Sequence, residues 1–249
     1  MRYRQLFQDT GTQAVRLAQS RPAAYAALPI FTAAGFLTGM GLVTAYGEAQ
    51  GLDLPDRLLL TMDGSWSEKF EYLLTAISCI AMVLTWRKAG SSVYLVLAIM
   101  FAWLTIDNSL ELHERVGGWL APAITWPGSS PGHAQHYGEL LLFAGVGLAS
   151  LLGLALALMT AAPWHQQRTA LLIILIGAAA VFGVGVDALD ALLLGSMPQA
   201  QQIGTFIEDA GELWMLCIIA VFSIAILCQT IKGEEEAGSS LVSKPSRSR

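Results

Sequence analysis

The segment SVYLVLAIMFAWLTIDNSLELHE, residues 92–114, joins an uninterrupted apolar run to a group of acidic residues. As an α-helix, the run from Val93 to Ile106 extends only about 21 Å, which is less than the ~30 Å hydrocarbon core of a bilayer. A helix that crosses the whole core must therefore carry Asp107 below the membrane boundary, with Glu111 close to it. The segment predicts a membrane-spanning helix with carboxylates buried at one end.

Similar apolar runs recur along the chain. Hydrophobic residues make up 54% of its 249 residues, charged residues make up 13%, and the mean hydropathy is +0.54. Runs close to the ~20 residues that a membrane helix needs lie at 27–46, 67–86, 92–112, 137–161, 169–193 and 205–231. The sequence therefore predicts an all-α integral membrane protein, a bundle of six transmembrane helices.

Basic residues are distributed unequally between the two ends of these spans. With the N-terminal arginines in the cytoplasm, eleven of the 14 lysines and arginines face the cytoplasm and three face the opposite side. We therefore expect both termini in the cytoplasm, with an N-terminal segment at 1–26, a transmembrane domain at 27–231 and a disordered polar tail at 232–249. In a bacterium, the protein would lie in the inner membrane with its acidic residues toward the periplasm.

Eleven of the 19 acidic residues fall at the outer ends of five spans. Within each span, helical spacing places such residues on one face, as for Asp107, Glu111 and Glu114. Because a carboxylate that faces lipid is costly, we expect these faces to meet inside the bundle, where bound metal ions or captured protons would neutralise them. Glu68 and Glu114 are interpreted instead as solvated helix ends.

The histidines favour a metal ion over protons. His113, His133 and His136 lie on the same outer side as the acids. His136 and Glu139 are one helical turn apart, which is a partial match to dimetal bundles because the familiar order there is Glu-x-x-His. Carboxylates combined with imidazoles suit Fe, Mn or Zn, whereas an all-oxygen site would suit Ca or Mg. The pattern predicts a divalent transition-metal site for one or two ions.

The expected ligands follow from depth and spacing. The deepest carboxylates are expected to bind the metal directly: Asp107, Glu111, Glu139, Asp187 and Glu212. Further ligands, or groups that orient the ligands, are expected at His113, His136, Glu71, Asp190, Glu208 and Asp209. The sequence assigns no catalytic residue.

Three classes of function are consistent with such a site. A membrane metalloenzyme would use the metal to activate water or oxygen against a lipid-soluble or periplasmic substrate. A proton- or metal-ion-coupled transporter would need polar groups that continue through the cytoplasmic half of the spans, which carries no charged residue. A nonenzymatic metal-binding sensor or accessory subunit is the third class. Membrane lipid and a metal ion are the expected partners.

Several other functions are not supported by the sequence. The chain is acidic, with a pI of about 5.3, and its basic residues are topological anchors, so nucleic-acid binding is not expected. The sequence contains no P-loop, HExxH or CxxC motif. Cys79, Cys217 and Cys228 fall inside predicted spans, where a thiol packs as a small apolar side chain.

The unequal basic residues generate a test of orientation. An impermeant thiol reagent applied to intact cells should label a cysteine introduced near Ser129 and should not label one introduced near Ala89. Labelling near Ala89 alone would reverse the orientation and place the acidic residues in the cytoplasm.

Overall fold

The computed structural model describes residues 2–52, 54–62, 64–124, 131–186 and 198–242. The described residues form helices and connecting turns, with no strand among them. The longer helices are α1 (Arg2–Ala18), α2 (Arg21–Ala49), α3 (Trp66–Ala89), α4 (Ser92–Leu110), α5 (Leu112–Ile124), α6 (Pro131–Thr160), α7 (Pro163–Ala180) and α9 (Pro198–Val242). The short helix η1 (Asp56–Leu58) precedes α3, and the π-helix η2 (Val181–Val186) extends α7.

Six helices in the described part of the chain are long and apolar enough to cross a membrane. They cover Arg21–Glu48, Trp66–Ala89, Ser92–Leu110, Ala134–Thr160, Pro163–Val186 and Ile203–Gly233. Each overlaps one of the spans predicted from the sequence. This confirms the predicted fold class, an all-α bundle of six membrane helices.

Helical structure also extends beyond the six spans. α1 occupies most of the N-terminal segment and packs against α7, with Leu17 fully buried. α9 continues past its span to Val242, so the sequence-based boundary at residue 231 falls within this helix.

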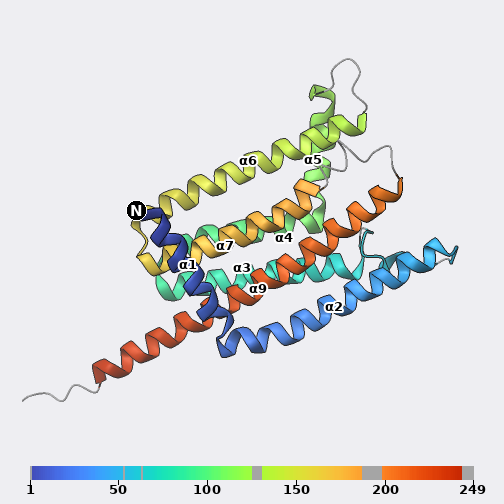
Figure 1. The fold of residues 1–249 in the computed structure, drawn as a ribbon. Helices are drawn as coiled ribbons and strands as arrows, with labels where there is room; N and C mark the ends of the chain where they lie inside the picture. Colours follow the sequence, from blue (N-terminus) through green and yellow to red (C-terminus); the bar gives the residue numbers. More distant parts are fainter. Residues whose placement is uncertain (1, 53, 63, 125–130, 187–197, 243–249) are drawn as a thin grey trace, which may run out of the picture.

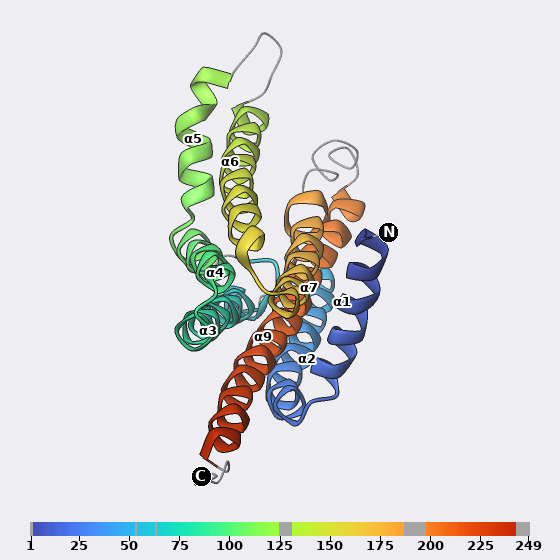
Figure 2. The same ribbon diagram turned by 90° about the vertical axis from the view of Figure 1, so that its left-hand side faces the viewer.

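α9 holds the bundle together. It contacts α2, α3 and α7, and α3 in turn packs along α4 (Figures 1 and 2). Fully buried side chains such as Leu213 and Ile226 of α9 and Phe101 of α4 belong to one apolar core. Large apolar side chains on the outer faces remain exposed, as at Phe36 (67%) and Leu156 (69%). Such a surface is suited to lipid rather than to water.

The ends of α3 fix where its acids lie. The Ser65 hydroxyl oxygen accepts a hydrogen bond from the backbone N–H of Glu68 at 3.3 Å, which caps the start of the helix. Gly90 ends the helix with a φ of 67°, a left-handed conformation that glycine adopts without a steric penalty. Glu68 and Glu71 therefore lie in the first two turns of α3, at one end of the bundle.

The chain breaks its helical path at Glu111. With a φ of 50°, Glu111 is the one non-glycine residue with positive φ in the described part of the chain, and α4 ends just before it, at Leu110. The prediction that Asp107, Glu111 and Glu114 share one face of a continuous helix is wrong, because the helix ends between them. The break instead lets His113, in the first turn of α5, lie against Asp107.

α5 packs closely along α6 (Figure 2). The contact depends on two glycines, since a Cβ atom on Gly138 would lie 2.7 Å from the backbone oxygen of Gly117. No larger residue fits at Gly138 without separating the two backbones. This close approach carries the side chains of α5 toward those of α6.

Candidate functional site

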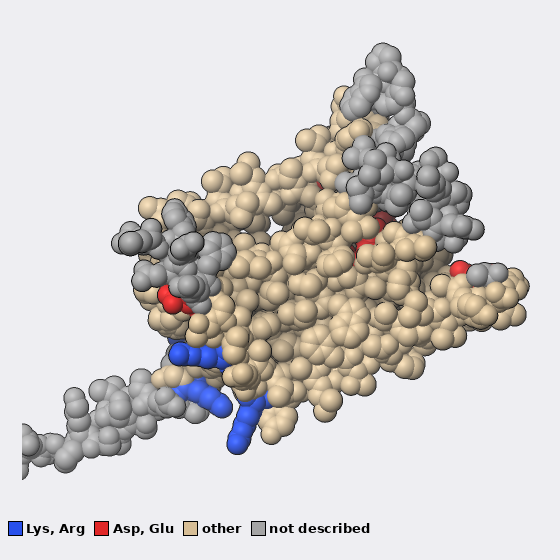
Figure 3. All heavy atoms as spheres, viewed as in Figure 1, with Lys and Arg blue, Asp and Glu red and all other residues tan. Residues whose placement is uncertain are grey.

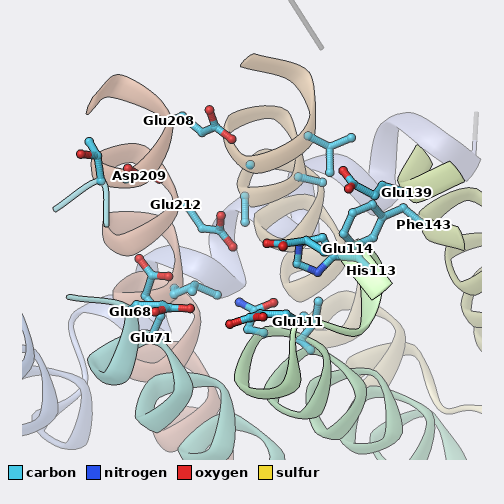
Figure 4. Close-up of a pocket in the computed structure, with 18 of the residues that line it drawn as sticks. Glu68, Glu71, Glu111, His113, Glu114, Glu139, Phe143, Glu208, Asp209 and Glu212 are labelled. Atoms are coloured by element: carbon cyan, nitrogen blue, oxygen red, sulfur yellow. The ribbon is translucent and has the colours of Figure 1, made fainter. Parts of the chain in front are cut away.

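A cavity of about 470 Å³ lies among α3, α4, α5, α6, α7 and α9 at the acidic end of the bundle (Figure 4). Residues 60–62, which precede α3, complete its wall. The basic side chains visible in Figure 3 gather toward the other end, where α2 begins and α9 leaves the bundle. The molecule is therefore polarised along its length.

Carboxylates dominate the polar part of the cavity wall. Eight of them line it: Glu68, Glu71, Glu111, Glu114, Glu139, Glu208, Asp209 and Glu212. His113 and His136 line it as well, and no lysine or arginine is found among the described lining residues. Lys69, which lies between two of these acids in the sequence, donates a hydrogen bond to the exposed carbonyl of Gly64 at 2.6 Å.

The structure brings most of the predicted site residues together. Eight of the eleven line the cavity: Glu71, Glu111, His113, His136, Glu139, Glu208, Asp209 and Glu212. Asp107 is buried behind His113 and is not among the lining residues. Asp187 and Asp190 lie outside the described residues.

Asp107 and His113 form a buried pair. The Asp107 side chain is fully buried, and its Oδ2 lies 3.3 Å from Nδ1 of His113. The His113 ring also packs against Phe143, with ring centroids 5.3 Å apart. Nδ1 is the ring nitrogen beside Asp107, so Nε2 is left for the cavity side, where Glu114 Oε1 lies 4.0 Å away. A carboxylate behind an imidazole is the common means of orienting a histidine that binds a metal or moves a proton.

The same pair sets the charge state of His113. The Asp107 carboxylate beside the ring raises the pKa of His113 above the ordinary value of 6.5, and the negative charges of Glu139 and Glu114 act in the same direction. Partial burial opposes them by favouring the neutral ring, and the net shift is upward.

Glu139 is held in place on α6. Gln135, one helical turn earlier, donates a hydrogen bond from Nε2 to Glu139 Oε1 at 3.0 Å. His136 Nδ1 lies 3.8 Å from Glu139 Oε2. Gly117 of α5 leaves room for this side chain, because a Cβ atom there would lie 2.5 Å from Glu139 Cγ. The imidazoles and carboxylates of α5 and α6 therefore share one side of the cavity.

Glu71 has no such partner. It is only 9% exposed, and no hydrogen-bond donor or basic side chain in the described part of the chain contacts its carboxylate. The charges of Glu212 and Asp209, from α9, act on it across the cavity. Glu68, three residues earlier, differs because the backbone N–H of Gly64 and the Tyr72 hydroxyl both donate to it.

Two glycines allow η2 and α9 to lie close together around Glu212. A Cβ atom on Gly183, within the π-helix η2, would lie 2.6 Å from Glu212 Oε2. Gly211, beside Glu212 on α9, is covered by the ring of Phe182. π-Helical turns often occur at functional sites, because they redirect one part of a helix. Here the turn brings the backbone of η2 directly against a carboxylate.

The rest of the cavity wall is apolar. The side chains that form it come mainly from α4, α6, α7 and α9 and include Leu104, Leu140, Phe143, Ile176, Leu216 and Ile219. The cavity thus combines a carboxylate-rich region with an apolar one, and it has the size of a small-molecule site.

As the side chains stand, no three His, Cys, Asp or Glu residues in the described part of the chain lie close enough together to hold a metal ion. The nearest approaches are pairs, such as His113 with Asp107 and His136 with Glu139. An entering ion would have to draw several glutamate side chains toward it.

Some lining residues were not selected from the sequence. Glu68 and Glu114, interpreted as solvated, both line the cavity. Gln135 could have been found, because it precedes Glu139 by one helical turn. Asn108, in the last turn of α4, carries no such signal.

The cavity lies within a segment that matches a known family model. Residues 65–228 match the model described as Domain of unknown function (DUF8692). The chain belongs to this family. The matched segment contains all eight carboxylates of the cavity, whereas α1 and α2 lie outside it. Comparisons with curated proteins and with solved structures found no match.

The buried pair generates a pH prediction for the metal-free protein. Replacing Asp107 with Asn removes the negative charge beside the ring, so the pKa of His113 should fall, as measured by NMR of ring-labelled histidine. His113 has a raised pKa in the folded protein, so it contributes stability that is complete below about pH 6.5 and is lost as the pH rises through the folded-state pKa.

Thermal unfolding measured from about pH 6.5 upward through the folded-state pKa of His113 should show this loss of stability in the wild type. Asp107→Asn should show a smaller loss of stability over the same pH range. Glu48→Gln, at an exposed acid of α2, is the matched control and should leave the titration unchanged. An unchanged His113 pKa in Asp107→Asn would show that the pair does not act as described.

Proposed function

We propose that this protein is a membrane-embedded metal-binding protein whose cavity holds one or two divalent transition-metal ions, Fe, Mn or Zn, and uses them as a metalloenzyme. The observation that carries the proposal is the orientation of His113. Its Nδ1 lies 3.3 Å from Oδ2 of the buried Asp107, and its Nε2 is left to the carboxylate-lined cavity. Mixed imidazole and carboxylate donors are the set that such ions prefer.

The ligands would come mainly from α5 and α6. His113, His136 and Glu139 lie on this side of the cavity, and Glu114 is 4.0 Å from the His113 ring. Because these groups do not already converge on one point, binding would require the flexible glutamate side chains to reorient. When bound, the metal would act as a Lewis acid or lower the pKa of a bound water. A cavity carboxylate would then serve as the general base.

The size of the cavity favours an enzyme over a sensor. A water molecule takes up about 30 Å³ of liquid, so a volume of about 470 Å³ leaves room for a substrate beside an ion and its waters. A sensor or accessory subunit would need no such space. The apolar wall further favours a substrate with a hydrocarbon part.

The far half of the bundle argues against transport. The buried hydroxyls that follow Glu71 along α3, those of Thr75, Ser78 and Thr85, each donate to a backbone carbonyl of their own helix. Nearer the far end, Arg168 is buried between Thr230 and Gln229, to whose oxygens it donates. A fixed buried cation there would repel a metal ion that left the cavity in this direction.

The proposed location is the bacterial inner membrane, with the cavity open to the periplasm. The distribution of lysine and arginine supports this orientation, because the basic end would lie in the cytoplasm. Metal ions and substrate would then reach the cavity without crossing the membrane.

Elemental analysis of protein purified without chelator tests the proposal. It should find about one or two equivalents of a transition metal per chain. His113→Gln and Glu139→Gln should each lower that content by at least about half, because each removes a ligand from a different helix. Glu48→Gln, outside the cavity, should leave it unchanged. A chelator should lower the melting temperature of the wild type more than that of His113→Gln.

Protein that contains no metal, is insensitive to chelators and is stabilised by acidification would contradict the proposal. The carboxylates would then be neutralised by protons.

A further inference from the structure

The cavity has a side wall that helix packing leaves open. α6 contributes Leu140 and Phe143 to one wall, and α7 contributes Ile176 and Ala179 to the facing one. α6 and α7 follow each other in the sequence, yet they are not among the helix pairs that pack together, unlike α3 with α4 or α7 with α9. Figure 2 shows the two helices diverging from their common turn.

That turn holds α6 and α7 together at the far end of the bundle. Gln166 at the start of α7 donates from Nε2 to the backbone oxygens of Leu158 and Ala161, at 3.2 and 3.0 Å. The separation therefore widens toward the acidic end, where the cavity lies. In a bilayer, a gap between two membrane helices faces lipid.

The lining changes from polar to apolar along this gap. Phe143 is one turn beyond Glu139 on α6, and Ile176 lies about 10 Å before Gly183 along α7. Both apolar residues are displaced toward the centre of the membrane relative to the acids. A molecule that fills this space would place a polar head among the carboxylates and a hydrocarbon chain between α6 and α7.

The negative charge of the cavity wall determines which head group of an amphiphile can bind there. Eight carboxylates line the cavity, and two divalent ions would balance only four of their charges. An anionic head, such as the phosphate of a phospholipid or the carboxylate of a fatty acid, would be repelled. Glu71, 9% exposed and without a hydrogen-bond donor in the described part of the chain, is an acceptor that a cationic head would satisfy.

We propose that the cavity takes a single-chain lipid amine, whose ammonium group lies between Glu71 and Glu212 and whose alkyl chain leaves the cavity between α6 and α7. The inference rests on the proposed function, because the same cavity would hold the metal on its α5 and α6 side. The substrate of that site would accordingly be an amphiphile that enters the cavity from the membrane.

The test uses hexadecylamine with a photoreactive diazirine in its chain, added to the protein in nanodiscs of phosphatidylcholine. The matching hexadecanoic acid probe is the control. The amine should label residues that line the gap, such as Phe143 and Ile176, and the acid should not. Unlabelled hexadecylamine should compete, whereas propylamine, which lacks the chain, should not compete at the same concentration.

Matched variants separate the contribution of the ammonium head group to binding from that of the alkyl chain. Glu71→Gln should reduce labelling by the amine about tenfold, because it removes a buried anionic partner, and Glu48→Gln should not. Ala179→Trp should obstruct the gap and reduce labelling similarly, whereas Ile174→Trp, at an exposed position of α7 outside the cavity lining, should not.

Three results would overturn the inference: equal labelling by the acid probe, equal competition by propylamine, or full labelling of Glu71→Gln. Metal content is measured on the same samples. Normal metal content with any of these results removes the lipid inference alone, and specific amine labelling of a protein without metal removes the proposed metal site alone.

Discussion

Repulsion among carboxylates that share one cavity between apolar helices is the constraint on which the rest of this structure depends. Two unit charges about 4 Å apart repel each other by roughly 4 kcal/mol at the effective dielectric constant of a protein near its surface. Eight carboxylates and no described basic side chain line the cavity. The apolar helices around it limit access of water to its deeper residues, and Glu71 is the most buried of the lining carboxylates. Such a cavity requires that its carboxylates be neutralised, either by bound cations, as proposed above, or by captured protons.

Several local features of the fold concentrate these charges instead of dispersing them. The left-handed residue Glu111 ends α4 and turns α5 so that His113 meets Asp107. The contact between Gly117 and Gly138 brings α5 against α6. The π-helix at the end of α7 places Gly183 against Glu212. Each feature carries a local cost in backbone conformation or helix propensity, and all three lie beside the cavity.

The fold was largely predictable from the sequence, because membrane spans are set by the length of apolar runs. The cavity was predictable in part, since acids at the outer ends of neighbouring spans must lie at similar depth. Glu71, Glu139 and Glu212 reach the wall for this reason. The role of Asp107 was not predictable, because it depends on a helix break after Leu110 that no glycine or proline marks. The gap between α6 and α7 was not predictable either, because it depends on how whole helices pack.

The central claim is that a bound metal ion, rather than protons, keeps the cavity carboxylates ionised. Infrared difference spectroscopy of the same sample before and after removal of metal tests it most directly, because protonated and ionised carboxyl groups absorb in separate bands. In the metal-loaded protein at neutral pH, the band of protonated carboxyl groups should be weak. It should grow when the metal is removed, and grow less in Glu71→Gln. A band of protonated carboxyl groups that is equally strong with and without metal would contradict the claim.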